Sequence, residues 1–158
     1  MPGRLRFLIL LLSLTLPACQ RDHLLGPSST EIVQKPALES IDSEPIRRLL
    51  TNAQEQLRLT KYYTQDYFSL EYPNGDPPIV TGACTDVIIR GFRAAGVDLQ
   101  NEVHEDIKEN FSAYPNKWGL QRPDTNIDHR RVPNLQTFFK RKGKSIAITS
   151  NAEDYKPG

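Results

Sequence analysis

Apolar residues recur at helical spacing in the first half of the chain and predict two helices there. One begins near Pro45, with Asp42 or Ser43 as its N-cap. Its apolar face comprises Ile46, Leu49, Leu50, Ala53 and Leu57. The other helix runs from about residue 85 to residue 95 and ends at Gly96, a residue type that suits the end of a helix.

Two further helices are predicted in the second half. Asp98 caps the first of them, and its apolar face comprises Leu99, Val103, Ile107 and Phe111. The second starts at Pro133 and stops at Gly143, and its apolar residues are Leu135, Phe138 and Phe139. The basic run "KRKGK" at its end suits either a phosphate ligand or the negative end of the helix dipole, and we favour the dipole.

The polar face of the Asp98 helix contains the triplet His-Glu-Asp, which raises the question of a metal site. The face comprises Glu102, His104, Glu105, Asp106, Lys108 and Glu109. Consecutive residues point in different directions around a helix, so His104, Glu105 and Asp106 do not converge on one ion. We expect a solvated face, no metal and no cofactor.

Strand signals are few. Ser145–Thr149, "SIAIT", predicts a short strand, and the apolar run Pro77–Val80 resembles one. The segment before it is rich in tyrosine and contains a turn at residues 74–76. Its tyrosines either line a binding site or pack on the core, and we expect packing on the core.

The composition limits the classes of function. The chain has 158 residues, enough for one domain with a core. It carries 20 basic and 19 acidic residues and a net charge of +1, which argues against a nucleic-acid-binding protein.

The N-terminus has the pattern of an export signal. Arg4 and Arg6 precede the apolar stretch Phe7–Leu16, which is shorter than the about 20 residues of a spanning helix. The string "LPAC" resembles a bacterial lipobox, so we expect acylation of Cys19. The alternative is an ordinary signal peptide cleaved near Ala18. We therefore divide the chain into a signal peptide (1–18), a lipidated N-terminus with a flexible tether (19–41) and a domain (42–158).

The predicted location follows from the lipid anchor. The residue after Cys19 is Gln20 and not the aspartate associated with inner-membrane retention. We expect a periplasmic protein of a Gram-negative cell, held in the outer membrane by its acyl chains. The membrane is then one partner, peptidoglycan is a second candidate, and no protein partner is indicated.

Cys84 is the chemically distinctive residue of the domain, because acylation of Cys19 leaves it as the free thiol. It lies where the second helix should begin, next to unpaired N–H groups and the positive end of the helix dipole. Both favour a thiolate, the nucleophilic form. Gly82 and Ala83 leave room beside it, and Asp86 adds a polar neighbour. The alternative is a small buried hydrophobe.

Several strings resemble one bacterial family. These are "YPNGDPPIVTGACTDVIIRGFRAAGVDLQ", "VHEDI", "YPNKWGL", "PDTNIDHRRVPNLQTFF" and "YKPG". From about Tyr62 onward the chain is identified as a member of the family called domain of unknown function 1287. That family is similar to papain-like, NlpC-type cysteine peptidases that cut cell-wall peptides. The resemblance implies an α+β fold with a helical N-terminal portion and an antiparallel sheet, and it implies that Cys84 is the nucleophile.

The resemblance also implies a histidine base on a strand after the "KPG" string, and the printed sequence ends at Gly158. We therefore expect a truncated domain whose sheet is incomplete because its C-terminal strands are missing. Among the histidines present, His129 in "NIDHRR" lies in a plausible functional loop beside Asp128. A structural hydrogen-bonding role is favoured over general base.

The sequence thus predicts an envelope lipoprotein that resembles a cysteine peptidase or amidase and is inactive in this form. The alternative is a non-catalytic binding or scaffold lipoprotein that uses the tyrosine-rich segment and the "NIDHRR" loop as contact surfaces. The accessibility of Cys84 separates the two, because an enzyme needs an exposed thiolate.

Overall fold

The computed structural model describes Leu38, residues 41–143 and residues 146–155. All of these residues lie within one unit, residues 33–158. The predicted signal peptide, Cys19, His23 and most of the predicted tether lie outside the described residues.

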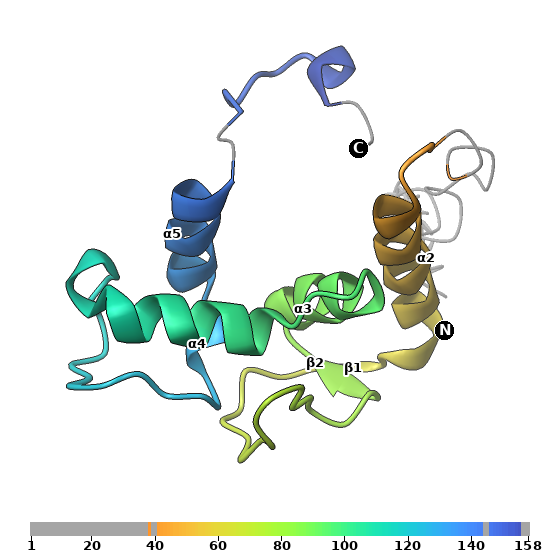
Figure 1. Ribbon diagram of the computed structural model, residues 1–158. Helices are drawn as coiled ribbons and strands as arrows, with labels where there is room; N and C mark the ends of the chain where they lie inside the picture. Colours follow the sequence, from red (N-terminus) through yellow and green to blue (C-terminus); the bar gives the residue numbers. More distant parts are fainter. Residues whose placement is uncertain (1–37, 39–40, 144–145, 156–158) are drawn as a thin grey trace, which may run out of the picture. The chain divides into compact units, whose positions relative to one another are not determined.

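Among the described residues, four α-helices longer than one turn account for most of the regular structure, and they are the four that the apolar pattern predicts. Figure 1 shows how these helices are arranged. They are α2 (Glu44–Leu59), α3 (Cys84–Ala94), α4 (Leu99–Glu109) and α5 (Val132–Lys142). Three short 3₁₀ turns are η1 (Phe111–Ala113), η2 (Asp128–Arg130) and η3 (Ala152–Asp154). The strands are β1 (Tyr62–Tyr63) and β2 (Thr81–Gly82).

The helix ends follow the capping signals in the sequence. Ser43 is the N-cap of α2, and Pro45 lies in its first turn, where a missing N–H costs nothing. The side chain of Asp98 caps α4 by accepting a hydrogen bond from the N–H of Gln100 at 3.1 Å. After α3 the chain turns at Gly96, whose φ of 91° is in the left-handed region.

The apolar faces of α3, α4 and α5 meet in one core. It contains Ile89, Leu99, Val103, Ile107, Tyr114, Leu135 and Phe138. Phe111, which the spacing placed on the same face, follows the end of α4 and is exposed by 36%. The α-helix ends at Glu109, and the tighter turn η1 rotates the next side chains away from the apolar face.

Helix α2 packs on α3. The close approach depends on Gly91, since a Cβ there would lie 3.1 Å from the Cγ of Leu49. Gln56 on α2 adds a polar link by donating from Nε2 to the carbonyl oxygen of Val87 at 3.2 Å. The start of α3 is thereby held against the side of α2.

The two strands pair in parallel, with Tyr62 opposite Thr81 and Tyr63 opposite Gly82. We expected antiparallel strands. The two strands run in the same direction because residues 64–80 form a long connection that returns the chain to the level of the start of β1. Parallel pairing requires such a connection. The antiparallel sheet of a papain-like domain stays an expectation.

The predicted strand Ser145–Thr149 is wrong for the residues that can be judged. Residues 146–149 have no strand structure, and Ser145 lies outside the described residues. Ile146 and Ile148 are exposed by 78% and 96%. Alternating apolar residues form a strand only when a neighbouring strand accepts their hydrogen bonds, and none of the described residues pairs with this segment.

The polar face of α4 is not wholly solvated, which corrects the prediction for Asp106. This residue is buried and contacts Arg141 at 2.7 Å and Lys142 at 3.0 Å, both at the end of α5. It also accepts a hydrogen bond from the hydroxyl of Tyr114 at 2.6 Å. Two of the basic residues of "KRKGK" therefore link α5 to α4, in addition to their position at the negative end of a helix dipole.

Candidate active site around Cys84

Cys84 is the first residue of α3 and is exposed, whereas the next two residues are buried. The chain enters the helix from β2 through Ala83, whose extended backbone ends the strand. Asp86, at the third helical position, turns back and accepts a hydrogen bond from the N–H of Ala83 at 2.6 Å. This contact fixes the helix start and leaves the thiol side chain pointing away from the core.

The residues after Cys84 hold the "NIDHRR" loop. The carboxylate of Asp86 forms a two-pronged ion pair with the guanidinium of Arg130, at 2.8 and 3.0 Å. The hydroxyl of Thr85 donates to the carbonyl oxygen of Arg130 at 3.0 Å. Arg130 further donates to the carbonyl oxygen of Asp66 at 2.9 Å and lies over the ring of Phe68. Three segments that are distant in sequence therefore converge beside the cysteine.

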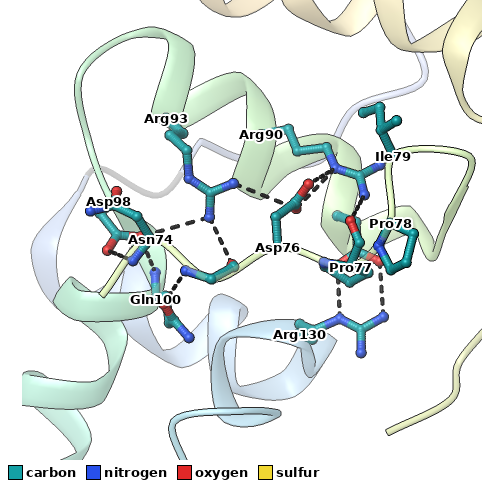
Figure 2. A network of polar contacts seen from close by, with 12 residues as sticks. Asn74, Asp76, Pro77, Pro78, Ile79, Arg90, Arg93, Asp98, Gln100 and Arg130 are labelled. Atoms are coloured by element: carbon teal, nitrogen blue, oxygen red, sulfur yellow. Dashed lines mark hydrogen bonds and ion pairs between the residues drawn. The ribbon is translucent and has the colours of Figure 1, made fainter. Parts of the chain in front are cut away.

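A second polar network supports the segment that leads into β2. Figure 2 shows Arg90 and Arg93, both from α3, reaching the carboxylate of Asp76. Arg90 is buried and bonds both oxygens of Asp76, at 3.0 and 2.9 Å, as well as the carbonyl oxygens of Pro77 and Thr81. An arginine in the middle of α3 therefore fixes the course of the strand that precedes Cys84.

The turn before this segment is anchored to the start of α4, as Figure 2 also shows. Asp98 accepts from the N–H of Asn74 at 2.8 Å, and buried Gln100 accepts from the N–H of Gly75 at 2.8 Å. A Cβ at Gly75 would collide with the carbonyl oxygen of Glu71, so the turn requires glycine there.

Two hollows meet at Cys84. The apolar hollow, of about 380 Å³, lies between α2 and the start of α3. Its lining includes Ala53, Leu57, Tyr62, Tyr63 and Val87, with Gln56 and Lys61 as polar members. The arginine hollow, of about 490 Å³, lies on the other side of the thiol and includes Gln65, Thr85, Trp118, Arg130 and Arg131. Tyr63, Ala83 and Cys84 line both hollows.

The tyrosines of the segment before β2 are exposed, so our prediction that they pack on the core is wrong. Tyr62, Tyr63 and Tyr67 are exposed by 68%, 66% and 59%. Tyr63 lies at the edge of both hollows, and Tyr67 lines the arginine hollow. The strand pair β1–β2 has no second layer over these side chains among the described residues.

Asp86, Asp128 and His129 were predicted as a polar site, and the structure places all three in the interior. The carboxylate of Asp86 is occupied by its hydrogen bond from the N–H of Ala83 and its ion pair with Arg130. Asp128 accepts from the N–H of Asp124 at 2.6 Å and contacts Arg131 at 3.3 Å, and burial raises the pKa of its carboxyl group.

His129 is almost fully buried and lines neither hollow. Burial, together with the nearby charge of Arg130, lowers the pKa of its imidazole from 6.5 to about 4. A general base works best when its pKa lies near the operating pH, so this residue is poorly suited to that role. His104, the other described histidine, lies beside Tyr72 and also lines neither hollow.

Sequence reasoning missed the roles of Arg130 and Arg131. Arg131 lies over the ring of Trp118, with 3.9 Å from its guanidinium carbon to the ring centroid, and forms one wall of the arginine hollow. Both arginines belong to the string "NIDHRR", but Trp118, which Arg131 covers, is 13 residues away, and Asp86, the ion-pair partner of Arg130, is 44 residues away. No local spacing connects such pairs, so the available signal was the charge of the string alone.

Neither a metal centre nor a membrane span is found in the part of the chain that the structure describes. No three His, Cys, Asp or Glu side chains in residues 41–143 and 146–155 converge as metal ligands would. No described helix is both long enough and apolar enough to cross a bilayer.

An exposed cysteine at a helix start, flanked by two hollows, defines a chain with a candidate thiol site on a largely helical scaffold. The chain belongs to the family described as "Domain of unknown function (DUF1287)", whose model matches residues 50–158. It is 46% identical over 123 residues to "Uncharacterized protein YijF" of Escherichia coli (strain K12), covering 78% of this chain and 60% of that protein. The chain thus spans less than two thirds of this relative's length. No solved structure matches the chain.

Proposed function

We propose that this protein is a cysteine hydrolase of the cell envelope that cleaves peptide or amide bonds, with Cys84 as nucleophile. The observation that carries the proposal is the exposed thiol at the first position of α3, flanked by two hollows large enough for substrate groups. The proposal also includes the resemblance of the sequence to NlpC-type peptidases, which implies the type of reaction and the role of Cys84. A buried cysteine would have argued against it.

The chemistry follows from the position of the thiol. The thiolate attacks the amide carbonyl carbon, a carbon–sulfur bond forms, and the carbon–nitrogen bond breaks as the amine leaves with a proton. Water then hydrolyses the thioester to a carboxylic acid and restores the thiol. The N–H of Asp86 already bonds the carbonyl oxygen of Ala83 at 3.0 Å, so the N–H groups of Cys84 and Thr85 are the ones proposed to stabilise the oxyanion.

Asp86 and Arg130 act as positioning residues in this proposal. They fix the N-terminus of α3 against the loop that forms the arginine hollow, so the thiol and both hollows keep a constant relative geometry. The described residues supply no histidine base at either hollow, so the proposed base lies elsewhere.

The envelope location rests on the N-terminal sequence alone, which lies outside the described residues. We propose that Cys19 is acylated and anchors the protein in the outer membrane, with peptidoglycan within reach of the domain. Metabolic labelling with a fatty-acid analogue should mark the protein, and the mark should vanish in Cys19→Ala. Label that persists in this variant removes the anchor from the proposal.

A binding or scaffold lipoprotein is the second candidate, and the exposed tyrosines favour it. Exposed aromatic surface lines the apolar hollow at Tyr62, the arginine hollow at Tyr67 and both hollows at Tyr63. Amphipathic aromatic side chains of this kind are common where proteins bind partners. A scaffold needs these side chains and not the thiol.

The deciding experiment compares the reactivity of Cys84 with turnover. In the full chain carrying Cys19→Ala, iodoacetamide at pH 7 should alkylate Cys84 without denaturant and faster than it alkylates a small-molecule thiol. Cys84→Ala should abolish the labelling and any hydrolysis of cell-wall peptides. Alkylation that occurs only in denaturant would remove the nucleophile and leave the scaffold.

A further inference from the structure

The outer edge of β1, opposite β2, has unpaired backbone groups. In the parallel register, the N–H group of Tyr62 points toward β2 and bonds the carbonyl oxygen of Val80 at 3.0 Å. The next ladder bond is made by the N–H of Thr64, which donates to the carbonyl oxygen of Gly82 at 3.0 Å. Alternate residues of a strand point their N–H and C=O groups to opposite edges. The backbone of Tyr63 therefore points away from β2.

Tyr63 also shares both hollows with the thiol, since Tyr63 and Cys84 both line them. No described residue bonds the backbone N–H or C=O group of Tyr63. An exposed strand edge with a free N–H and C=O pair is a template for one more extended chain. Because Tyr63 and Cys84 line the same hollows, an extended peptide bound at this edge can place its side chains in hollows that the thiol also lines.

The apolar hollow fits a side chain of such a peptide. Its walls are mostly aliphatic and aromatic, formed by Ala53, Leu57 and Val87 from the helices and by two tyrosines from β1. About 380 Å³ is ample for one aliphatic or aromatic residue. Side chains of an extended peptide alternate in direction, so one residue enters this hollow while its neighbours face the other way.

The depth of the apolar hollow has a polar feature that also favours a peptide. Gln56 is exposed by only 3%, and its Nε2 donates to Asn52 at 2.7 Å and to the carbonyl oxygen of Val87. Its Oε1 has no hydrogen-bond partner among the described residues. A buried acceptor without a hydrogen bond is unfavourable, and an N–H donor removes this cost. Every peptide residue except proline carries such a donor.

We propose that the substrate of Cys84 is a peptide bound in extended form along the edge of β1, with an apolar side chain in the hollow between α2 and α3. The proposal rests on the function proposed above and narrows its substrate from amides in general to extended peptides with an apolar residue next to the reacting bond. The backbone of Tyr63 supplies alignment, and the hollow supplies selectivity.

The test uses probes that label Cys84 without turnover. The probes are the iodoacetyl derivatives of leucine methylamide, glycine methylamide and N-methyl-leucine methylamide. In each case the sulfur bonds the probe's CH₂ carbon, iodide leaves, and the thiol proton passes to buffer. The full chain is used, peptide mapping reads Cys84 separately from Cys19, and rates are normalised to those with glutathione.

Binding of the leucine side chain should make the leucine probe label Cys84 about tenfold faster than the glycine probe, with saturation. The N-methyl probe should label Cys84 about tenfold more slowly than the leucine probe, because it lacks the N–H that pairs with protein acceptors. Ala53→Trp fills the apolar hollow and should bring the leucine-to-glycine ratio close to one. Ala113→Trp makes the same substitution at an exposed position that lines neither hollow and should leave that ratio unchanged.

Equal normalised rates for the leucine and glycine probes would overturn the inference, as would a ratio that Ala53→Trp does not alter. Protection of Cys84 by an N-acetylglucosamine oligomer without a leucine preference would also overturn it and assign the hollows to a glycan. The outcome is separable from that of the proposed function. Selective labelling without any hydrolysis, even when imidazole is added as a base, keeps the peptide site and removes the hydrolase, and hydrolysis without selectivity does the reverse.

Discussion

At the scale of single residues, the contrast between Cys84 and its neighbours carries the most information. Thr85 and Asp86 are both buried and both bonded to Arg130, whereas Cys84 is exposed between two hollows. Burying the ion pair between Asp86 and Arg130 costs desolvation free energy, so some role must explain its place directly beside an exposed thiol. That role is to join the helix start to the loop that forms the arginine hollow.

Breaking this ion pair should destabilise the protein strongly. Asp86→Asn leaves the guanidinium of Arg130 buried without its anion, and we expect a loss of about 3 kcal/mol in the free energy of unfolding. Denaturant titration measures it. Glu44→Gln is the matched control, because it removes a carboxylate from an exposed pair with Arg47 and Arg48 and should change little. Equal effects in the two variants would contradict a structural role for Asp86.

His129 should titrate far below an ordinary histidine. Burial lowers its pKa from 6.5 to about 4, so the folded protein binds fewer protons than the unfolded chain between these values. Stability is therefore unaffected by this group above pH 6.5 and declines as the pH falls from there toward 4. Imidazole NMR shifts measured against pH report the titration directly. A midpoint near 6.5 would mean that the ring is accessible and would restore it as a candidate base.

At the scale of elements, local pattern predicted what local forces determine. The helical spacing from Ile46 to Leu57 and the capping signals at Asp98 and Pro133 need only neighbouring residues, and those predictions are confirmed. The Ser145–Thr149 strand and the core packing of the tyrosines needed distant partners. The sequence does not say which segment supplies them.

The link between α4 and α5 is an example of such a distant interaction. Asp106 was assigned to a solvated face because its neighbours on α4 are polar, but Arg141 approaches it from 35 residues away. The same limit applies to the candidate site. Position in the sequence predicted the helix start at Cys84, and the hollows depend on α2, β1 and the "NIDHRR" loop coming together.

Asp106 should make the stability of this link depend on pH. The hydrogen bond from Arg141 holds the pKa of its carboxyl group well below the ordinary value of 3.8, with Tyr114 and Lys142 adding to the effect. A lowered folded-state pKa means that the stabilisation is complete above the unfolded pKa and is lost as the pH falls below about 4. Asp106→Asn should cost about 2 kcal/mol at pH 7 and show a flatter decline in acid.

Thermal unfolding between pH 7 and pH 2 tests this expectation. Glu109→Gln is the control, since Glu109 is an exposed residue of the same helix with no ion-pair partner among the described residues. It should follow the parent protein at every pH. A parallel decline of Asp106→Asn and the parent would show that the carboxylate does not contribute to the acid sensitivity.

At the scale of the whole molecule, the question is what completes a thiol site. The family model matches residues 50–158, and the Escherichia coli relative is longer than the matched region. Within the described residues, the exposed thiol that we propose as nucleophile, the helix start and both hollows are present. Both described histidines lie away from the hollows, so neither is placed to act as the base for Cys84.

Free imidazole should therefore restore turnover to the 158-residue chain. General acid–base catalysis contributes about 10²–10⁴-fold, so hydrolysis of a leucine-containing peptide should be near background in plain buffer at pH 7. Added imidazole should raise the rate in proportion to its unprotonated concentration, because it takes the proton from Cys84 and returns it to the leaving amine. Tetramethylimidazolium at equal ionic strength has no basic nitrogen and should have no effect.

The variants decide how this result is interpreted. Cys84→Ala should remain at background at every imidazole concentration, whereas His129→Gln should respond like the parent, since that ring is buried and reaches neither hollow. Turnover that depends on Cys84 but not on imidazole would show that the chain contains its own base. No response in any variant, from a thiol that alkylates normally, would favour the scaffold lipoprotein, because accessibility and an added base together should be sufficient for at least slow acyl transfer.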